Sequence, residues 1–354
     1  MNLETLSLVL ILSAVPAAGA QAPECSPGAG AETCHVAHSR QLGGHTFLYP
    51  ILQQSALITT QFGLHEGVAF FDVPDLPVIT LGLRDVSLKG FQQTLELELG
   101  LTDWLGLEGF ARGTLVMGAT PTELLLGGAQ RSLVGQAGGV ARLLRSEKTG
   151  TQLSFRAHGS YQDGAEININ PLLNGLVTSP VQTVGAVLDG NLRELIVVPT
   201  SEMSVRGGLY LAQAFSALFS LQASAAMEYG WLTRKPFSGM LDTRVTQKGD
   251  ALRVLLAFAL AADFGPKGVP VGVMGEYQLI AGRDHEENRA DRSLGASTVA
   301  LGVYYTGRPH LQLGVGLATT LHAEPLRGVG TLGEELLSGD PTLDYGQLVL
   351  RYIW

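Results

Sequence analysis

The feature that most constrains this chain is a regular alternation of apolar and polar residues. In the stretch FSALFSLQASAAMEYGW, from Phe215 to Trp231, every odd position is aromatic or apolar, and most even positions are serine, glutamine, glutamate or glycine. Successive side chains of a β-strand point to opposite faces, whereas a helix would mix the two sets around its circumference. The stretch therefore predicts one long strand. Its length suits a tilted strand of about nine to eleven residues that crosses a membrane better than an ordinary strand of about five or six.

The same alternation recurs along the chain, each time with one apolar and one mostly polar face. Clear examples are FQQTLELELGLT, ALRVLLAFALAADF, VPVGVMGEYQLIAG and HLQLGVGLATTLH. The pattern predicts about twelve strands, at residues 54–66, 91–102, 104–117, 136–146, 150–162, 203–212, 214–230, 250–263, 269–281, 294–305, 309–322 and 343–354. Residues 54–66 alternate poorly, and the stretch VITLGLRDVSL, residues 78–88, competes with them for the first strand.

Composition favours a membrane protein built from strands. Charged residues make up 16% of the chain, against roughly 25% in an average soluble protein. A membrane-spanning helix needs about 20 mostly apolar residues. The longest candidate beyond the N-terminal residues, from Leu252 to Phe264, is too short and contains Arg253. The formal net charge of -9 and the absence of a basic run argue against a nucleic-acid partner.

The connections between the predicted strands are short and long in turn. They are tight after the even-numbered strands, as in LTDWL, SEKTG and TGRP, and longer after the odd-numbered ones. This parity is typical of barrels that span an outer membrane. The predicted fold is all-β: a single antiparallel transmembrane β-barrel of about twelve strands, with short periplasmic turns, long external loops and both termini in the periplasm.

The chain ends on the residues QLVLRYIW. Leu348, Leu350, Tyr352 and Trp354 share one face of the predicted last strand. A final strand with alternate hydrophobic residues and a terminal aromatic resembles the last strand of bacterial outer-membrane β-barrels. The resemblance covers about residues 50–354 and names no single family. It implies the outer membrane of a Gram-negative bacterium, contact with outer-membrane lipid, and recognition of the last strand by the barrel-assembly machinery.

The N-terminus has the features of an exported chain. A short apolar core from Leu6 to Val15 precedes the small residues Ala18, Gly19 and Ala20. We therefore expect a signal peptide at residues 1–20, a short N-terminal segment at 21–50 and the barrel at 51–354.

Both cysteines, Cys25 and Cys34, fall in the short N-terminal segment. In an exported chain they most simply form one disulfide. A metal site that adds His35 and His38 is an alternative, as are free thiols and an intermolecular bond.

The alternation also predicts which charged residues and which histidine face the lumen. They are Glu96, Glu98, Glu108, Arg112, Arg142, Arg156, His158, Arg206, Glu228, Arg253, Glu276 and Arg351. Lys or Arg near the middle of the lipid-facing surface costs about 2–4 kcal/mol, so we expect that surface to carry no charge. The lumen residues either line a water-filled channel or pair across a narrow lumen and fill it. Aromatic residues near strand ends predict interface girdles: Tyr229, Trp231, Tyr305, Tyr352 and Trp354.

Function follows from the barrel rather than from a catalytic motif. His158 and Ser160 form a His-x-Ser pair like that of outer-membrane lipid hydrolases, but the alternation points both inward, away from lipid. We expect no catalytic residue, cofactor or metal, and favour a porin-like passive channel for a small solute of unknown identity. The alternatives are a non-conducting barrel that binds a partner, and a lipid hydrolase. The apolar residues 163–202 either plug the lumen or extend as a hairpin above the membrane.

Overall fold

The computed structural model describes residues 40–78, 82–118, 129–167, 197–235, 237–238, 243–287, 291–323, 325, 327–329 and 335–354. The predicted signal peptide, Cys25, Cys34 and the alternative metal ligands lie outside these residues.

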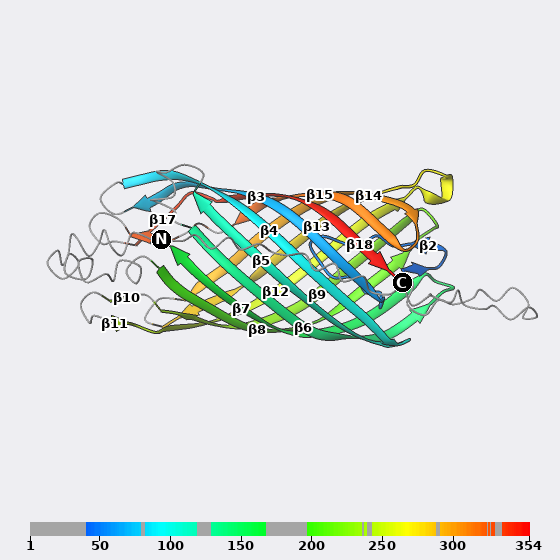
Figure 1. Ribbon diagram of the computed structural model, residues 1–354, viewed down its shortest axis with the longest axis horizontal. Coiled ribbons are helices and arrows are strands. Elements are labelled where there is room, and N and C mark those ends of the chain that lie inside the picture. The colour runs from blue at the N-terminus through cyan, green and yellow to red at the C-terminus, as the bar shows by residue number, and fades with distance from the viewer. Residues whose placement is uncertain are drawn as a thin grey trace, which may run out of the picture. The chain divides into compact units, whose positions relative to one another are not determined.

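Twelve long strands form one closed barrel, in the order β12-β13-β14-β15-β18-β3-β4-β5-β6-β7-β8-β9 (Figure 1). They are β3 (Gln61–Val78), β4 (Gly82–Thr102), β5 (Leu105–Gly118), β6 (Ala129–Ser146), β7 (Thr151–Ile167), β8 (Val197–Ala214), β9 (Phe219–Arg234), β12 (Gln247–Asp263), β13 (Val271–Glu286), β14 (Arg292–Arg308), β15 (Leu311–Ala323) and β18 (Thr342–Ile353). The predicted fold class, an all-β antiparallel barrel, is confirmed.

Shorter elements complete the described chain. They are β1 (Gln41–Leu42), β2 (His45–Thr46), β10 (Phe237–Ser238), β11 (Thr243–Arg244), β16 (Arg327–Val329), β17 (Glu335–Leu337) and a 3-10 turn at Gly265–Lys267. Among the described residues, no helix is long and apolar enough to cross a membrane.

The barrel closes where the last strand meets the first. β18 pairs antiparallel with β3 from Thr342 opposite Asp72 to Ile353 opposite Gln61. In lipid, an open sheet edge would leave backbone N–H and C=O groups without partners, so closure is what makes a membrane-spanning sheet stable. The resemblance to bacterial outer-membrane β-barrels is confirmed at the level of this closed fold.

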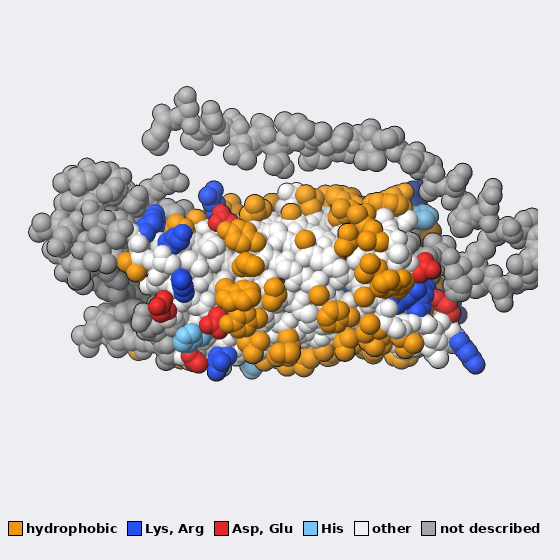
Figure 2. Space-filling model, turned by 90° about the horizontal axis from the view of Figure 1, so that it is seen from below, with side chains coloured by type: hydrophobic (Ala, Val, Ile, Leu, Met, Phe, Trp, Pro, Cys, Tyr) orange, Lys and Arg blue, Asp and Glu red, His pale blue; other side chains and the backbone are white. Residues whose placement is uncertain are grey.

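The outer surface is apolar around its middle. Figure 2 shows hydrophobic side chains spread over the central part of the barrel, with charged side chains gathered near its two ends. Leu301, Leu317 and Leu348 are more than 60% exposed, as lipid-facing residues should be. The predicted girdle residues lie near strand ends on this surface. Tyr229 packs on Trp231 at the end of β9, and Tyr352 packs on Trp354 at the end of β18.

Glu66 departs from this pattern and corrects the expectation of a charge-free lipid face. Glu66 of β3 is exposed between the outward-facing residues Phe62 and Phe70. Its Oε1 accepts a hydrogen bond of 3.0 Å from Nε2 of Gln93, the opposite residue on β4. The Gln93 amide thus gives the Glu66 carboxylate one of the hydrogen bonds that water would give it outside lipid.

We expect Glu66→Leu to raise the free energy of unfolding by about 1 kcal/mol, because it removes a carboxylate from a lipid-facing position. Gln93→Leu should lower the free energy of unfolding, because the Glu66 carboxylate then loses the amide that donates a hydrogen bond to it. Urea unfolding of the barrel in lipid vesicles measures both. A Glu66→Leu variant no more stable than the wild type would contradict this placement.

The two ends of the barrel differ in their connections. At one end the turns are tight, as at Asp103–Trp104 between β4 and β5 and Pro309–His310 between β14 and β15. At the other end the strands run beyond the predicted ranges, so the connection between β3 and β4 spans only residues 79–81 and is not the long loop that we expected.

Residues 163–202, expected either to plug the lumen or to extend as a hairpin, are strand at both ends. Residues 163–167 belong to β7 and pair with β8 from Asp163 opposite Ser201 to Ile167 opposite Val197. They form the base of a hairpin. Residues 168–196 lie outside the described residues.

A different segment fills the lumen. Residues 40–60, here called the inner segment, precede β3 and run inside the barrel, where Phe47, Leu48 and Leu57 are almost completely buried. The predicted first strand at 54–66 is therefore wrong in its first half. Residues 54–60 have no strand partner, and β3 begins at Gln61 and extends to Val78.

Candidate functional site: the lumen around the inner segment

Side chains of the barrel wall bind the backbone of the inner segment. A buried segment outside a sheet must satisfy its N–H and C=O groups in another way. Six wall residues from five strands do this here. They are Glu98 of β4, Gln152 and Arg156 of β7, Gln222 of β9, Glu276 of β13 and Gln312 of β15.

Counted by strand, β7 therefore contributes two of the six and the other four strands one each, and Ser154 and Gln278 add further bonds.

Arg156 lies at the centre of this arrangement and is 1% exposed. Its Nε donates to the carbonyl oxygen of Ser55 at 2.7 Å, and its Nη2 donates to that of Leu57 at 2.9 Å. Its Nη1 pairs with Glu108, and Nη2 also lies 3.5 Å from Oε2 of Glu98. One guanidinium thus joins two carboxylates of the wall to two carbonyls of the inner segment.

Carboxylates and amides hold the rest of the segment. Glu276 accepts hydrogen bonds from the backbone N–H groups of Ile51 and Leu52, at 2.7 and 2.9 Å. The Gln312 amide binds both the N–H and the C=O of Tyr49, as a neighbouring strand would. Glu98 accepts from the N–H of Thr59 at 2.9 Å. Side chains of the wall therefore bind the backbone groups that a neighbouring strand would bind in a sheet.

Apolar contacts pack the inner segment against the wall near the end of the barrel with the tight turns. Leu42, Phe47, Ala56 and Leu57 form one buried cluster with Tyr210 and neighbouring alanines of β8. Leu48 forms another with Met274, Tyr304 and alanines of β12. Alanine is common on the inner faces of β8 and β12, and it leaves the room that these larger side chains occupy.

The tip of the β1–β2 hairpin is fitted to the turn between β6 and β7. Gly43 has φ +58°, and a Cβ atom at this position would lie 2.7 Å from Cα of Gly150. The Gly43 N–H donates to Oε2 of Glu147 in the same turn at 3.0 Å. A glycine is required here both for its backbone conformation and for the close approach.

His45, in the same hairpin, lies outside the membrane-spanning strands. Its Nδ1 lies 3.0 Å from the carbonyl oxygen of Ala217, so the neutral ring donates from Nδ1. Burial lowers the pKa of His45 and favours this neutral form.

Two further charge networks lie in the lumen. Arg351 pairs with Glu96 at 3.0 Å, and its guanidinium lies 4.9 Å from the ring centroid of Tyr49. Nε2 of His65 lies 3.2 Å from the same Glu96 carboxylate.

The second network joins three strands of the opposite part of the wall. Arg206 pairs with Glu228, and Arg253 donates to both Glu228 and Glu202, at 2.7 and 2.8 Å. Because these charges are paired across neighbouring strands, none of them is buried in the lumen without an opposite charge.

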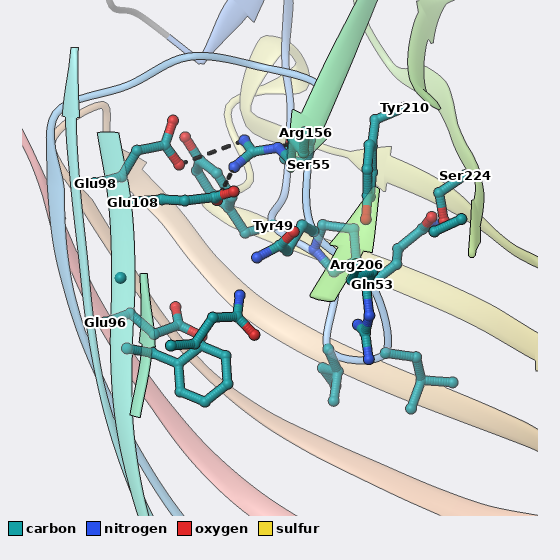
Figure 3. A pocket seen from close by; sticks show the side chains of 18 of the residues that line it. Tyr49, Gln53, Ser55, Glu96, Glu98, Glu108, Arg156, Arg206, Tyr210 and Ser224 are labelled. Carbon is teal, nitrogen blue, oxygen red and sulfur yellow. Dashed lines mark hydrogen bonds and ion pairs between the residues drawn. The ribbon is translucent and has the colours of Figure 1, made fainter. Parts of the chain in front are cut away.

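A cavity of about 210 Å³ lies between the inner segment and the wall (Figure 3). The inner segment contributes residues 49–55 to its lining, and the wall contributes mostly polar side chains. Figure 3 shows Arg156 reaching toward Glu98 and Glu108, with Glu96, Arg206 and Tyr210 around the same space. The cavity can therefore hold a small polar molecule or water.

The predicted lumen residues are not all in one place. Most of them lie in the networks above, while Arg112 of β5 lines the cavity separately. Arg142 lies instead near the tight turns, where its charged neighbours are Arg145, Asp103 and Glu147. Its strand partner is the buried Ser154 of β7, which places Arg142 on the inner face, and a β-bulge follows directly after it, between Arg142 and Leu144.

His158 and Ser160 lie on the inner face of β7, but they are not arranged as a catalytic pair. The Ser160 hydroxyl is 2.7 Å from that of Ser204. Neither ring nitrogen of His158 has a hydrogen-bond partner among the described residues, and Nδ1 is 3.8 Å from Oε1 of Glu108. Among the described residues, His158 therefore does not act on this serine as a base.

Sequence reasoning missed the inner segment and the uncharged residues that bind it. Gln152, Gln222 and Gln312 are buried, and the alternation does not distinguish them from other inward polar positions. A usable signal was present: residues 47–59 are largely apolar but lack the period of two. Within the described ranges, no group of three or more His, Cys, Asp or Glu side chains is placed to hold a metal ion.

Comparison with known proteins gives likeness of fold alone. No protein-family model matches the chain, and no curated protein sequence matches it. One similar solved structure is the COG4313 outer membrane channel from Pseudomonas putida F1. The two sequences are 10% identical, the match covers 87% of this chain and 100% of that chain, and the TM-score is 0.45.

Two other similar structures have different described roles. The translocator domain of the autotransporter NalP from Neisseria meningitidis has 7% identity, 84% and 89% coverage of this chain and that chain, and a TM-score of 0.47. The Pseudomonas putida toluene transporter TodX has 13% identity, 90% and 97% coverage, and a TM-score of 0.40. Values this low describe a shared barrel architecture and do not distinguish among these roles.

We expect Arg156→Met to loosen the inner segment while the barrel stays closed. The change leaves the Ser55 and Leu57 carbonyls and the Glu98 and Glu108 carboxylates without their shared donor, at a cost of about 3–5 kcal/mol. Amide hydrogen exchange over residues 47–59 should become at least about tenfold faster.

Arg253→Met is the matched control, because this arginine also faces the lumen but, among the described residues, pairs with Glu202 and Glu228 and not with the inner segment. It should leave exchange in the inner segment unchanged. Equal protection of residues 47–59 in both variants would show that Arg156 does not anchor the segment.

Proposed function

We propose that this protein is a passive channel for small solutes in a bacterial outer membrane, with the inner segment as a fixed constriction. The observation that supports this most is the polar cavity between the inner segment and the wall. The polar side chains around this space, such as Glu96 and Arg112, offer a hydrated solute groups to contact.

The inner segment occupies part of the lumen, so the proposed solute path is limited to the cavity beside it. The cavity is lined by residues of the segment on one side and by Glu96, Arg112 and Arg206 of the wall on the other. A solute passing through such a space exchanges its hydration for these polar groups, and its size is limited by the segment. The termini would lie in the periplasm with the tight turns, as in barrels of this class.

The second candidate is a non-conducting barrel that binds a partner through its outer end. The dense packing of Phe47, Leu48 and Leu57 near the end with the tight turns favours it, because these side chains pack the inner segment against the wall there. The two candidates differ in whether the wild-type protein conducts.

Single-channel recordings in planar bilayers test the proposal. We expect a small, steady conductance from the wild type. The double variant Glu276→Leu/Gln312→Leu should conduct at least about twice as well, because it removes the side chains that bind the backbone of residues 49–52.

Glu202→Leu/Gln347→Leu is the matched control. Both residues face the lumen, but they bind Arg253 and Tyr345 rather than the inner segment. Its conductance should stay close to that of the wild type. A silent wild type with a conducting Glu276→Leu/Gln312→Leu variant would favour the non-conducting barrel, and silence of every variant over a wide salt range would reject the channel.

A further inference from the structure

Arg112 differs from the other cavity-lining arginines in having no carboxylate partner. Arg156, Arg206 and Arg351 each form an ion pair with a glutamate. Within the described residues, no carboxylate lies at ion-pair distance from Arg112. Its Nε donates to the hydroxyl of Thr94, the opposite residue on β4, at 3.3 Å. The two terminal nitrogens of its guanidinium therefore keep their donors for another group.

The neighbouring charges cannot complete this site. Glu96 acts electrostatically on Arg112, but its carboxylate is already bound by Arg351 at 3.0 Å and lies 3.2 Å from His65. Arg206 also acts on Arg112 and is cationic, which adds to the positive potential there. The part of the cavity around Arg112 therefore favours an anion.

The shape of the site indicates a small organic anion. Phe110, two residues earlier on the same face of β5, also lines the cavity, and the Arg112 guanidinium lies 5.0 Å from its ring centroid. An apolar surface thus adjoins a planar fork of donors. Guanidinium groups bind carboxylates through two parallel hydrogen bonds, and the ring can contact a short carbon chain.

We propose that Arg112 and Phe110 form a binding site for a small carboxylate solute in the lumen. This inference names the solute class of the proposed channel and rests on that function for its physiological role. Thr94 positions the guanidinium, Arg112 binds the carboxylate, and Phe110 contacts the attached carbon chain. A neutral or cationic molecule of the same size would lack the ionic contact.

Binding to purified full-length protein in detergent micelles tests this without any conductance. The probes are butyrate, butanol and butylammonium, which share a carbon chain and differ in charge. Titration calorimetry should show saturable binding of butyrate alone. Arg112→Met should weaken butyrate binding by about tenfold or more, as expected for the loss of a charge-assisted contact.

Two further variants control for net charge and for folding. Arg142→Met removes the same charge near the tight turns, outside the cavity lining, and should leave butyrate binding unchanged. Arg112→Lys keeps the charge without the planar fork and should retain part of the affinity.

Equal butyrate binding by the wild type and Arg112→Met would overturn the proposal, as would binding of inorganic phosphate without butyrate. Its failure is distinguishable from that of the channel. Conductance without butyrate binding would reject the carboxylate site alone, and butyrate binding in a silent barrel would reject the channel and leave the site in place.

Discussion

The structure depends on one constraint: the backbone of residues 47–60 of the inner segment lies inside the barrel without belonging to a sheet. Its N–H and C=O groups need partners in a space from which most water is excluded. The barrel wall supplies them with long polar side chains such as Arg156, Glu276 and Gln312. This requirement explains why the lumen contains buried glutamine and paired charges instead of only water-facing polar residues.

The lumen charges consequently have a structural role before any role in transport. Arg156 balances two carboxylates and two backbone carbonyls at once. Arg351 and Arg206 are each held by a glutamate. Arg112 alone among these cavity-lining arginines has no such restraint within the described residues, and a group with unused donors beside a cavity is the one most able to contact a solute.

The strands and their facing could be predicted because lipid imposes a strict period of two. Residues such as Leu350 and Tyr352 must face lipid, so Arg351 between them must face inward, as it does. The same rule failed just after Arg142, where a bulge leaves both Leu143 and Leu144 exposed. It also failed at Glu66, where the pairing with Gln93 lets a carboxylate lie on the outer surface.

By itself, the sequence determined the all-β class, the closed barrel and the position of nearly every strand, because the alternation is a local property of each strand. Only the tertiary structure decided what occupies the lumen. Residues 47–59 carry no period that distinguishes a strand from an inserted segment, and their partners lie up to 263 residues away along the chain, as Gln312 does from Tyr49. Such contacts exist only in the tertiary structure of the closed barrel, so no local sequence pattern predicts them.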